Sequence, residues 1–373
     1  MIYLDYAAET PVSLEVLQTF YDVSTAYIAN PNASHQLGRE AKARLDSSTN
    51  QIAHILGVKE SEIIYTSGAS ESNNLAIKGI ASAYKKYGKH IITTYLEHSS
   101  VTGALAALQN IGYEVDFVDI LDNGLVDLEH LKELLREDTI LVSIGYVDSE
   151  IGIKQPIDKI GHLLALYPHC SFHVDATQAI GKIPVSLSTI DLVTFAPHKF
   201  YGLNGCGILI KKDNVLIEPQ IHGGKSTTVF RSGTPMLALV VAAEKALTLA
   251  TLELETRYEY VKELNKVLKK ALSDYKGVRI NSTEEAVPFI LNISIKGINT
   301  VAFQEALENH QIYLSTKSAC CAPNTPSRPV YALTKDRKLA LSTLRISLSH
   351  LTTSEECDIF LECFDQCYKK LVK

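Results

Sequence analysis

The sequence predicts an α/β protein whose mainly parallel central sheet is covered by helices on both faces. Two observations lead to this expectation. Between about residues 63 and 210, short apolar runs of strand length alternate with amphipathic segments of helix length. Such alternation favours parallel strands, because each crossover helix packs onto a face of the sheet. With 373 residues, the chain can bury a large core and should divide into about two domains.

The expected large domain spans residues 13–255. It begins with two helices, one from about Ser13 and one over about 38–56. Its seven strands are expected at 63–66, 90–94, 114–118, 140–145, 171–175, 192–195 and 207–210. A polar loop follows Gly223-Gly224, and Pro235 then opens an apolar, Ala-rich helix.

The expected small α+β domain combines residues 1–12 and 256–373. A charged helix at 253–272 carries the chain into it. Its other elements are expected to be strands at 288–295, 312–315 and 344–348 and a helix at 300–309. Three prolines between residues 316 and 329 predict an irregular segment, so we expect a long loop at about 316–343.

Charge and composition argue against several classes of function. The chain has 36 basic and 42 acidic residues, which gives no electrostatic basis for binding nucleic acid or a membrane. No apolar run is long enough to cross a bilayer, and the first residues lack a signal-peptide core, so we expect a cytoplasmic protein. Seven cysteines without paired spacing argue against a disulfide framework. Cys363 and Cys367 share a helix face, where packing explains them better than a metal does.

Polar groups at the ends of three expected strands suit pyridoxal phosphate (PLP). Lys199 follows one strand; most such lysines are solvated, but a partly desolvated one can form a Schiff base. Asp175 ends another strand, and a carboxylate there would keep the pyridine ring protonated, although a structural salt bridge is the alternative. Ser67-Gly68 leads into a helix whose free N–H groups suit a phosphate. Because open α/β sheets bind ligands at this edge, the three groups together favour PLP.

Ordered motifs run through nearly the whole chain. They are Tyr3-Leu-Asp-Tyr-Ala-Ala8, Asn30-Pro-Asn-Ala-Ser-His35, Thr66-Ser-Gly-Ala-Ser-Glu-Ser-Asn-Asn-Leu-Ala-Ile-Lys-Gly79, Glu97-His98, His173-Val-Asp-Ala-Thr-Gln178, His198-Lys199, Arg231-Ser-Gly-Thr234 and Ser318-Ala-Cys320. In these motifs the sequence resembles the NifS/IscS-type cysteine desulfurases, class V aminotransferase enzymes with the PLP-dependent fold type I. The resemblance implies PLP as cofactor, L-cysteine as substrate, a homodimer and a protein that accepts the sulfur.

The resemblance also implies roles for individual residues. Those that would contact the cofactor are Lys199, Asp175, Gln178, His98, Ala69, Ser70, His198, Ser149 and Thr234. Lys199 would bind PLP covalently, and His98 would stack on its ring. Gln178 would lie near the ring oxygen, and Thr234 would reach the phosphate in the partner subunit. Arg345 would hold the substrate carboxylate with its fork of N–H donors.

Cys320 decides the reaction type. A desulfurase needs a thiolate that attacks the substrate sulfur, becomes a persulfide and passes the sulfur on, here for iron–sulfur cluster assembly or tRNA thiolation. Cys320 lies in a segment rich in proline and polar residues, whereas a free structural cysteine is usually buried. Its match within Ser318-Ala-Cys320 favours the catalytic role.

Four departures from the family pattern bear on activity. Asp148-Ser149-Glu150 replaces the common Asn-Asn-Glu, Ala196 replaces a phosphate-binding serine, Lys225-Ser-Thr-Thr228 replaces a polar run, and Cys321 doubles Cys320. One lost hydrogen bond to the phosphate would weaken cofactor binding by about 1.5–3 kcal/mol, unless Lys225 or a water compensates. Two alternatives therefore stay open. One is a related class V enzyme, such as a selenocysteine or cystine lyase or a transaminase, and the other is a catalytically weak homologue that acts as a partner protein.

Overall fold

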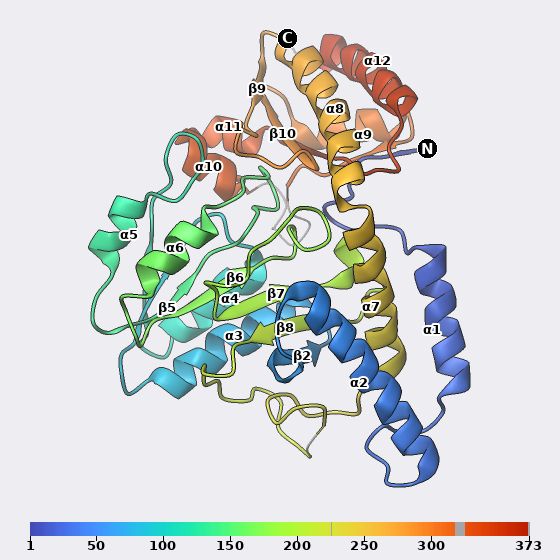
Figure 1. Cartoon of the computed structure of the whole chain (residues 1–373). Coiled ribbons are helices and arrows are strands. Elements are labelled where there is room, and N and C mark those ends of the chain that lie inside the picture. Colours follow the sequence, from blue (N-terminus) through green and yellow to red (C-terminus); the bar gives the residue numbers. More distant parts are fainter. Residues whose placement is uncertain (225, 318–324, 372–373) are drawn as a thin grey trace.

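A seven-stranded sheet forms the centre of the molecule (Figure 1). The computed structural model describes residues 1–224, 226–317 and 325–371. In spatial order the strands are β2 (Ile63–Thr66), β8 (Gly207–Lys211), β7 (Leu192–Phe195), β6 (Ser171–Asp175), β5 (Thr139–Ser143), β3 (His90–Thr93) and β4 (Glu114–Phe117). Strands β3 to β7 pair in parallel, and β8 is antiparallel to both of its neighbours. The mainly parallel α/β sheet predicted from the sequence is confirmed.

Both faces of this sheet are buried except at the edge strand β4, which is partly exposed. Successive residues of a strand point to opposite faces, so each strand contributes to two cores. In β3, Ile91 packs in the core that contains side chains of α3 (Ala69–Tyr84) and α4 (Ser99–Gln109). Ile92 packs in the core on the other face. The helices that contribute to that second core include α1 (Leu14–Ala26), α2 (Gln36–Leu56), α5 (Leu128–Leu134), α6 (Ile157–Leu164) and α7 (Leu237–Leu252).

Two smaller sheets are formed by the N-terminal residues and the C-terminal third of the chain. One is antiparallel, in the order β12 (Thr343–Ser347), β10 (Ile290–Ile295) and β9 (Val278–Ile280). The other pairs β1 (Ile2–Tyr3) in parallel with β11 (Ile312–Tyr313), which brings the N-terminal residues beside the C-terminal third of the chain. Figure 1 shows α8 (Leu254–Ser273), α9 (Thr300–Glu308) and α12 (Ser354–Leu371) above the large sheet, with α8 continuing from α7.

The prediction of a loop at about 316–343 is wrong for the second half of this segment. Residues there form the helices α10 (Arg328–Thr334) and α11 (Arg337–Leu341). Ser327 caps α10, since its hydroxyl accepts from the N–H of Val330. Pro329 lies in the first turn of α10, where a missing N–H costs nothing, so a residue that suggested a loop is compatible with a helix start.

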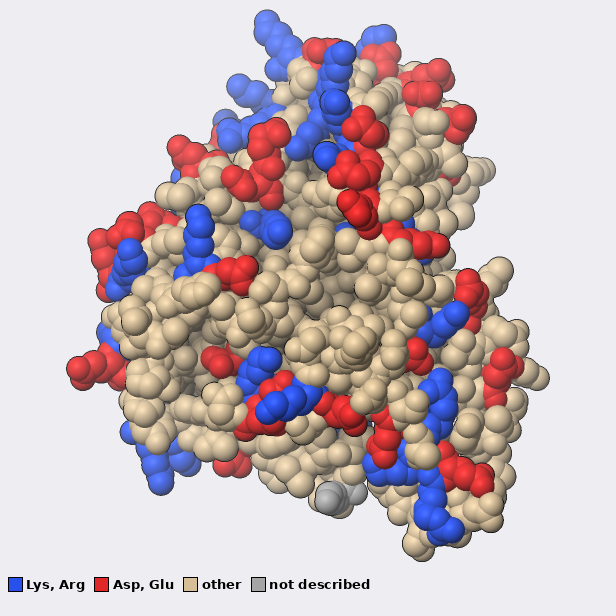
Figure 2. Space-filling view, viewed as in Figure 1, with Lys and Arg blue, Asp and Glu red and all other residues tan. Residues whose placement is uncertain are grey.

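Short 3₁₀ turns complete the described structure, at Glu60–Glu62 and at Pro197–Lys199. Basic and acidic side chains are interspersed over the face that Figure 2 shows, without a large area of one sign. Among the residues described, no helix has the length and apolar character needed to cross a membrane.

Candidate active site

A cavity of about 410 Å³ lies at the carboxyl ends of the strands of the large sheet. The predicted site residues that line it are Lys199, Asp175, Gln178, His98, Ala69, Ser70, His198, Ser149 and Arg345. They come from the carboxyl end of β6, from the segments that follow β2, β3, β5, β6 and β7, and from β12, so the fold brings together residues far apart in sequence. Thr234 is exposed and does not line this cavity. Cys320 falls outside the described residues.

Lys199 reaches the cavity from the turn that follows β7. Its Nζ donates to the carbonyl oxygens of Ala7, at 3.0 Å, and Ala8. Burial, helped by the charge of Arg345, lowers the pKa of Lys199 to about 8. A lysine with this pKa provides far more neutral amine at pH 7 than a solvated lysine does, and the neutral amine is the nucleophile.

Asp175 is held in place by two donors. The amide of Asn73 donates to its Oδ2 at 2.7 Å, and the backbone N–H of Thr177 donates to its Oδ1 at 3.0 Å. Asn73 itself extends from α3 and also donates to Ser100. The carboxylate is thereby oriented at the cavity wall, as pairing with a pyridine nitrogen requires. Asn73 was not predicted as a site residue, although it lies one turn after the phosphate-binding motif.

The start of α3 provides the anion-binding part of the cavity. Ala69 and Ser70 line the cavity in the first turn of this helix, where backbone N–H groups have no intrahelical acceptor. Gly207 of β8 allows the turn to pack closely, because a Cβ there would lie 2.3 Å from the carbonyl carbon of Gly68. This helix start fits a phosphate group.

His198 adds a second feature that fits a phosphate. Its Nδ1 is buried and has no hydrogen-bond partner among the residues described. Burial, with the charges of Lys199 and Lys182, lowers the pKa of His198 to about 4, so the ring is neutral at pH 7. A neutral ring protonated on Nδ1 could donate to an oxygen in the cavity. Ala196, where the family commonly has a phosphate-binding serine, is fully buried and does not line the cavity.

His98 has a fixed ring orientation. It caps α4, where its Nδ1 accepts from the backbone N–H of Ser100 at 3.2 Å. Burial lowers its pKa, so the ring is neutral and carries its proton on Nε2. A neutral ring held at the cavity wall fits stacking on a flat cofactor.

Arg345 is almost completely buried on β12. Its Nη2 pairs with Oδ1 of Asp5 at 2.7 Å, and its Nη1 donates to the carbonyl oxygen of Ser149 at 2.9 Å. Asp5 in turn accepts from the hydroxyl of Ser315. The Nε of Arg345 has no hydrogen-bond partner in the described part of the chain. A fixed guanidinium with a donor left over fits the carboxylate of an amino-acid substrate.

Two buried acidic residues, Glu97 and Asp148, line the cavity and were not predicted as site residues. Glu97 accepts from the N–H of Gly145 and from Thr94, and burial raises its pKa to about 8. Asp148 accepts from the N–H groups of Glu150 and Ile151 through Oδ1, and its Oδ2 is buried without a partner among the described residues. Burial, followed by the charge of Glu150, raises the pKa of Asp148 to about 7.

Asp148→Asn should stabilise the protein at alkaline pH. The folded state holds the Asp148 proton up to about pH 7 and the unfolded state only to about pH 4, so this residue's contribution to stability falls as the pH rises between those values. Asparagine does not titrate, so the free energy of unfolding of the variant should exceed that of the wild type by about 1–3 kcal/mol at pH 8. Thermal unfolding midpoints of the apoprotein at pH 5 and pH 8 measure it. If the midpoint of the variant exceeded that of the wild type by no more at pH 8 than at pH 5, the raised pKa of Asp148 would be contradicted.

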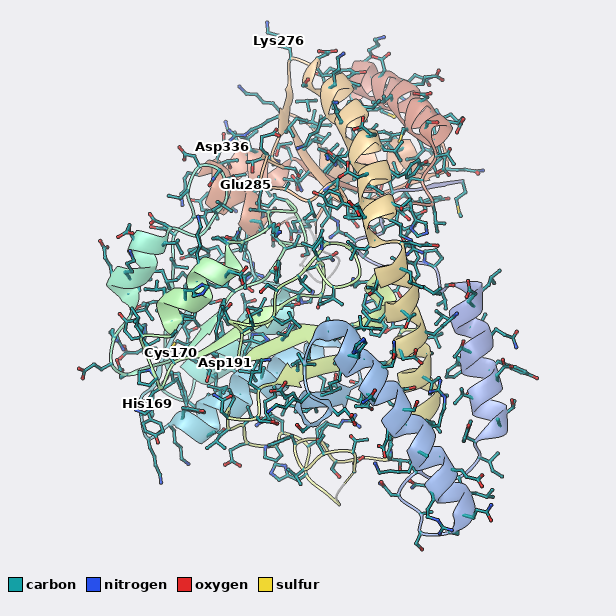
Figure 3. The ribbon with its side chains drawn as sticks, in the orientation of Figure 1. His169, Cys170, Asp191, Lys276, Glu285 and Asp336 are labelled. Atoms are coloured by element: carbon teal, nitrogen blue, oxygen red, sulfur yellow. The ribbon has the colours of Figure 1, made fainter. Side chains whose placement is uncertain are left out.

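The described cysteines are poor candidates for a nucleophile. Cys170, Cys206, Cys357, Cys363 and Cys367 are all buried. Burial raises the pKa of Cys206 to about 12, and burial with the charge of Asp191 does the same for Cys170. Cys170 and Asp191 lie next to one another before β6 and β7 (Figure 3), at the opposite ends of these strands from the cavity.

Comparison with known proteins agrees with this geometry. The aminotransferase class V family model matches residues 2–360. A NifS/IcsS protein homolog of Lactobacillus delbrueckii subsp. bulgaricus is 38% identical over 379 residues, covering 100% of this chain and 98% of the relative. A cysteine desulfurase IscS of Escherichia coli is 40% identical over 370 residues, covering 97% and 91%. A solved NifS-like protein superimposes with a TM-score of 0.93 at 34% identity, covering 99% of this chain and 100% of that one. The protein therefore belongs to the class V aminotransferase family, whose members use PLP.

Proposed function

We propose that this protein is a PLP-dependent cysteine desulfurase, which converts L-cysteine to L-alanine and leaves a persulfide on Cys320. One observation carries the proposal: Lys199, Asp175, His98 and Arg345 line the same cavity. An amine for the cofactor aldehyde, a carboxylate for its ring, a flat partner and a cation for the substrate carboxylate are thus within one space. A relative that matches 97% of the chain carries the same activity in its name.

Each site residue has a separate role in the reaction. Bound PLP supplies an electron sink for the substrate. Arg345 orients the substrate carboxylate, and Lys199, with its lowered pKa, can accept a proton and return it. The thiolate of Cys320 forms a bond with the substrate sulfur while the carbon–sulfur bond breaks and its electrons remain on carbon. Protonation of that carbon gives alanine.

We also propose a division into two domains, a cellular location and a route for the sulfur. The chain has a large domain at 13–255 and a small domain made of 1–12 and 256–373. The protein acts in the cytoplasm and passes sulfur to an acceptor protein for iron–sulfur cluster assembly or tRNA thiolation. The names of the IscS-type relatives support the first of these routes more directly than the second.

Purified protein incubated with L-cysteine tests the proposal. We expect cofactor absorbance that changes on mixing, formation of alanine and one persulfide on the protein. Release of alanine without a protein persulfide would favour the lyase. Failure to bind PLP would favour a partner protein without activity.

The protein should be a homodimer with shared active sites. Thr234 is exposed and lies away from the cavity of its own chain, as a residue that serves the partner's phosphate would be. Thr234→Ala should therefore weaken PLP retention and leave the unfolding midpoint of the apoprotein unchanged. Sedimentation of the wild type should give a dimer at micromolar concentration, whereas a monomer with full PLP content would refute the shared site.

A further inference from the structure

We propose that Lys182 is a positioning residue that fixes the side-chain amide of Gln178 as a hydrogen-bond donor to the cofactor. The inference deepens the proposed function, because it names a residue outside the main cavity lining that acts on the same site through Gln178. Lys182 lies four residues after Gln178, in a helical turn that follows β6. Residues at this spacing lie on the same face of such a turn.

The orientation of the Gln178 amide follows from its two neighbours. Its nitrogen faces the carbonyl oxygen of Ala7 at 2.9 Å, and a carbonyl oxygen can only accept. The amide oxygen must then face the other way, where the Nζ of Lys182 donates to it at 2.7 Å. The orientation of a side-chain amide is inferred from its hydrogen bonds, and the contacts with Ala7 and Lys182 require the same orientation.

This arrangement leaves one N–H of Gln178 for the cavity. The Nε2 group has two hydrogens, and Ala7 takes one of them. Gln178 lines the cavity, so the second hydrogen is available to an oxygen atom of the bound cofactor. The same carbonyl oxygen of Ala7 also accepts from the Nζ of Lys199 at 3.0 Å. A continuous hydrogen-bond network therefore joins Lys182, Gln178, Ala7 and Lys199.

Removing the amine of Lys182 would leave a buried acceptor without a partner. Gln178 is only 6% exposed, so its Oε1 has little access to water. Lys182 has no ion pair among the described residues, and it borders a second cavity of only about 10 Å³. Without the Lys182 amine, the amide of Gln178 would be stabilised by rotating until its oxygen meets another donor. The N–H that is available to the cofactor would then be lost.

The surroundings of Lys182 are compatible with this task over a wide pH range. Desolvation, together with the charges of Lys199 and Arg345, lowers the pKa of Lys182 to about 7. An amine has N–H groups to donate in both protonation states, so the contact with Gln178 persists when the charge is lost.

A double-mutant cycle on PLP binding tests the inference. The apoproteins of the wild type, Lys182→Met, Gln178→Met and the double variant are titrated with PLP, and the dissociation constant and the absorbance maximum of the bound cofactor are recorded. Each single substitution should raise the dissociation constant roughly 3–10-fold, as the loss of one hydrogen bond does. The double variant should be no weaker than Gln178→Met, because the hydrogen bond of Lys182 acts on the cofactor through Gln178.

Two further variants separate positioning from general stability. Lys182→Arg keeps a donor and should restore most of the affinity and the wild-type absorbance maximum. Lys211 is another enclosed lysine, bonded to the carbonyl oxygens of Lys212 and Val215 away from the cavity. Lys211→Met should lower the unfolding midpoint without changing the dissociation constant for PLP.

Independent effects of the two substitutions in the cycle would overturn the inference. So would a Lys182→Met variant with the affinity and absorbance of the wild type, or a wild type that does not bind PLP. The titrations contain no L-cysteine, so they are separate from the test of function. A protein that shows the expected cycle but forms no alanine would refute the desulfurase and leave the role of Lys182 intact.

Discussion

Lys199→Ala should abolish both turnover and the covalent attachment of PLP. Lys199 brings its amine to the cavity wall, and burial lowers its pKa to about 8, which favours attack on an aldehyde. Alanine offers no nucleophile, so PLP bound to the variant should be removed by dialysis. We expect alanine formation to fall to the rate measured without protein.

Borohydride reduction followed by peptide mass spectrometry gives the direct measurement. In the wild type the reduced cofactor should be found on the peptide that contains Lys199, and in the variant no peptide should carry it. Lys159→Ala, which removes an exposed lysine of α6, is a control and should behave as the wild type. Covalent PLP in the Lys199→Ala variant would identify a different lysine, and Lys182 would be the first to examine because its pKa is also lowered.

Local sequence signals were enough to predict the sheet. The strands β2 and β7 are mostly apolar and fully buried, so hydrophobic runs mark them directly, whereas β6 is buried but has only two apolar residues, Phe172 and Val174. Asp175 ends β6 and Lys199 follows β7, and the general rule for ligand sites in open sheets predicted that the two lie together. Strand β1 could not be predicted, because it has two residues and pairs with a strand some 300 residues later.

The partners of the site residues could not be read from the sequence. Asp5 and Arg345 are 340 positions apart, and only the fold brings their side chains within 2.7 Å. The same is true of Asn73 with Asp175, which are 102 positions apart. Such pairs depend on tertiary structure, whereas motif matching identifies single positions.

The N-terminal segment shows how far this dependence extends. Asp5 holds Arg345, the carbonyl oxygens of Ala7 and Ala8 hold the Lys199 amine, and Thr10 donates to the carbonyl oxygen of His198. A segment with only two residues of strand therefore contacts both the cofactor side and the substrate side of the cavity. The sequence placed this segment in the small domain and marked residues 3–8 as a family motif, but it predicted no contact with the site.

Cys320→Ala should abolish desulfuration and leave cofactor binding unchanged. The described cysteines are buried, and the pKa values of Cys170 and Cys206 are raised, so none of the five suits attack on a substrate in the cavity. The chain on both sides of Cys320 is anchored beside the cavity. Before it, Ser315 donates to Asp5 and accepts from the backbone of Arg345. After it, Ser327 donates to Glu150.

Cys321→Ala is the matched control for this prediction. Two neighbouring side chains rarely point the same way, and the spacing of Ser318-Ala-Cys320 agrees with the family motif. A disulfide between adjacent residues requires a distorted peptide, so Cys321 should not inactivate its neighbour. The Cys321→Ala variant should keep alanine formation and change at most the transfer of sulfur to an acceptor.

Alanine formation, cofactor absorbance and mass spectrometry of the trapped persulfide together decide the outcome. In the Cys320→Ala variant, alanine should fall to the level without protein while the cofactor absorbance of the wild type remains. A persulfide on Cys321 with full activity in Cys320→Ala would move the nucleophile by one residue. If neither substitution affects alanine formation, no thiolate of this segment attacks the substrate, and the reaction is that of a lyase or a transaminase.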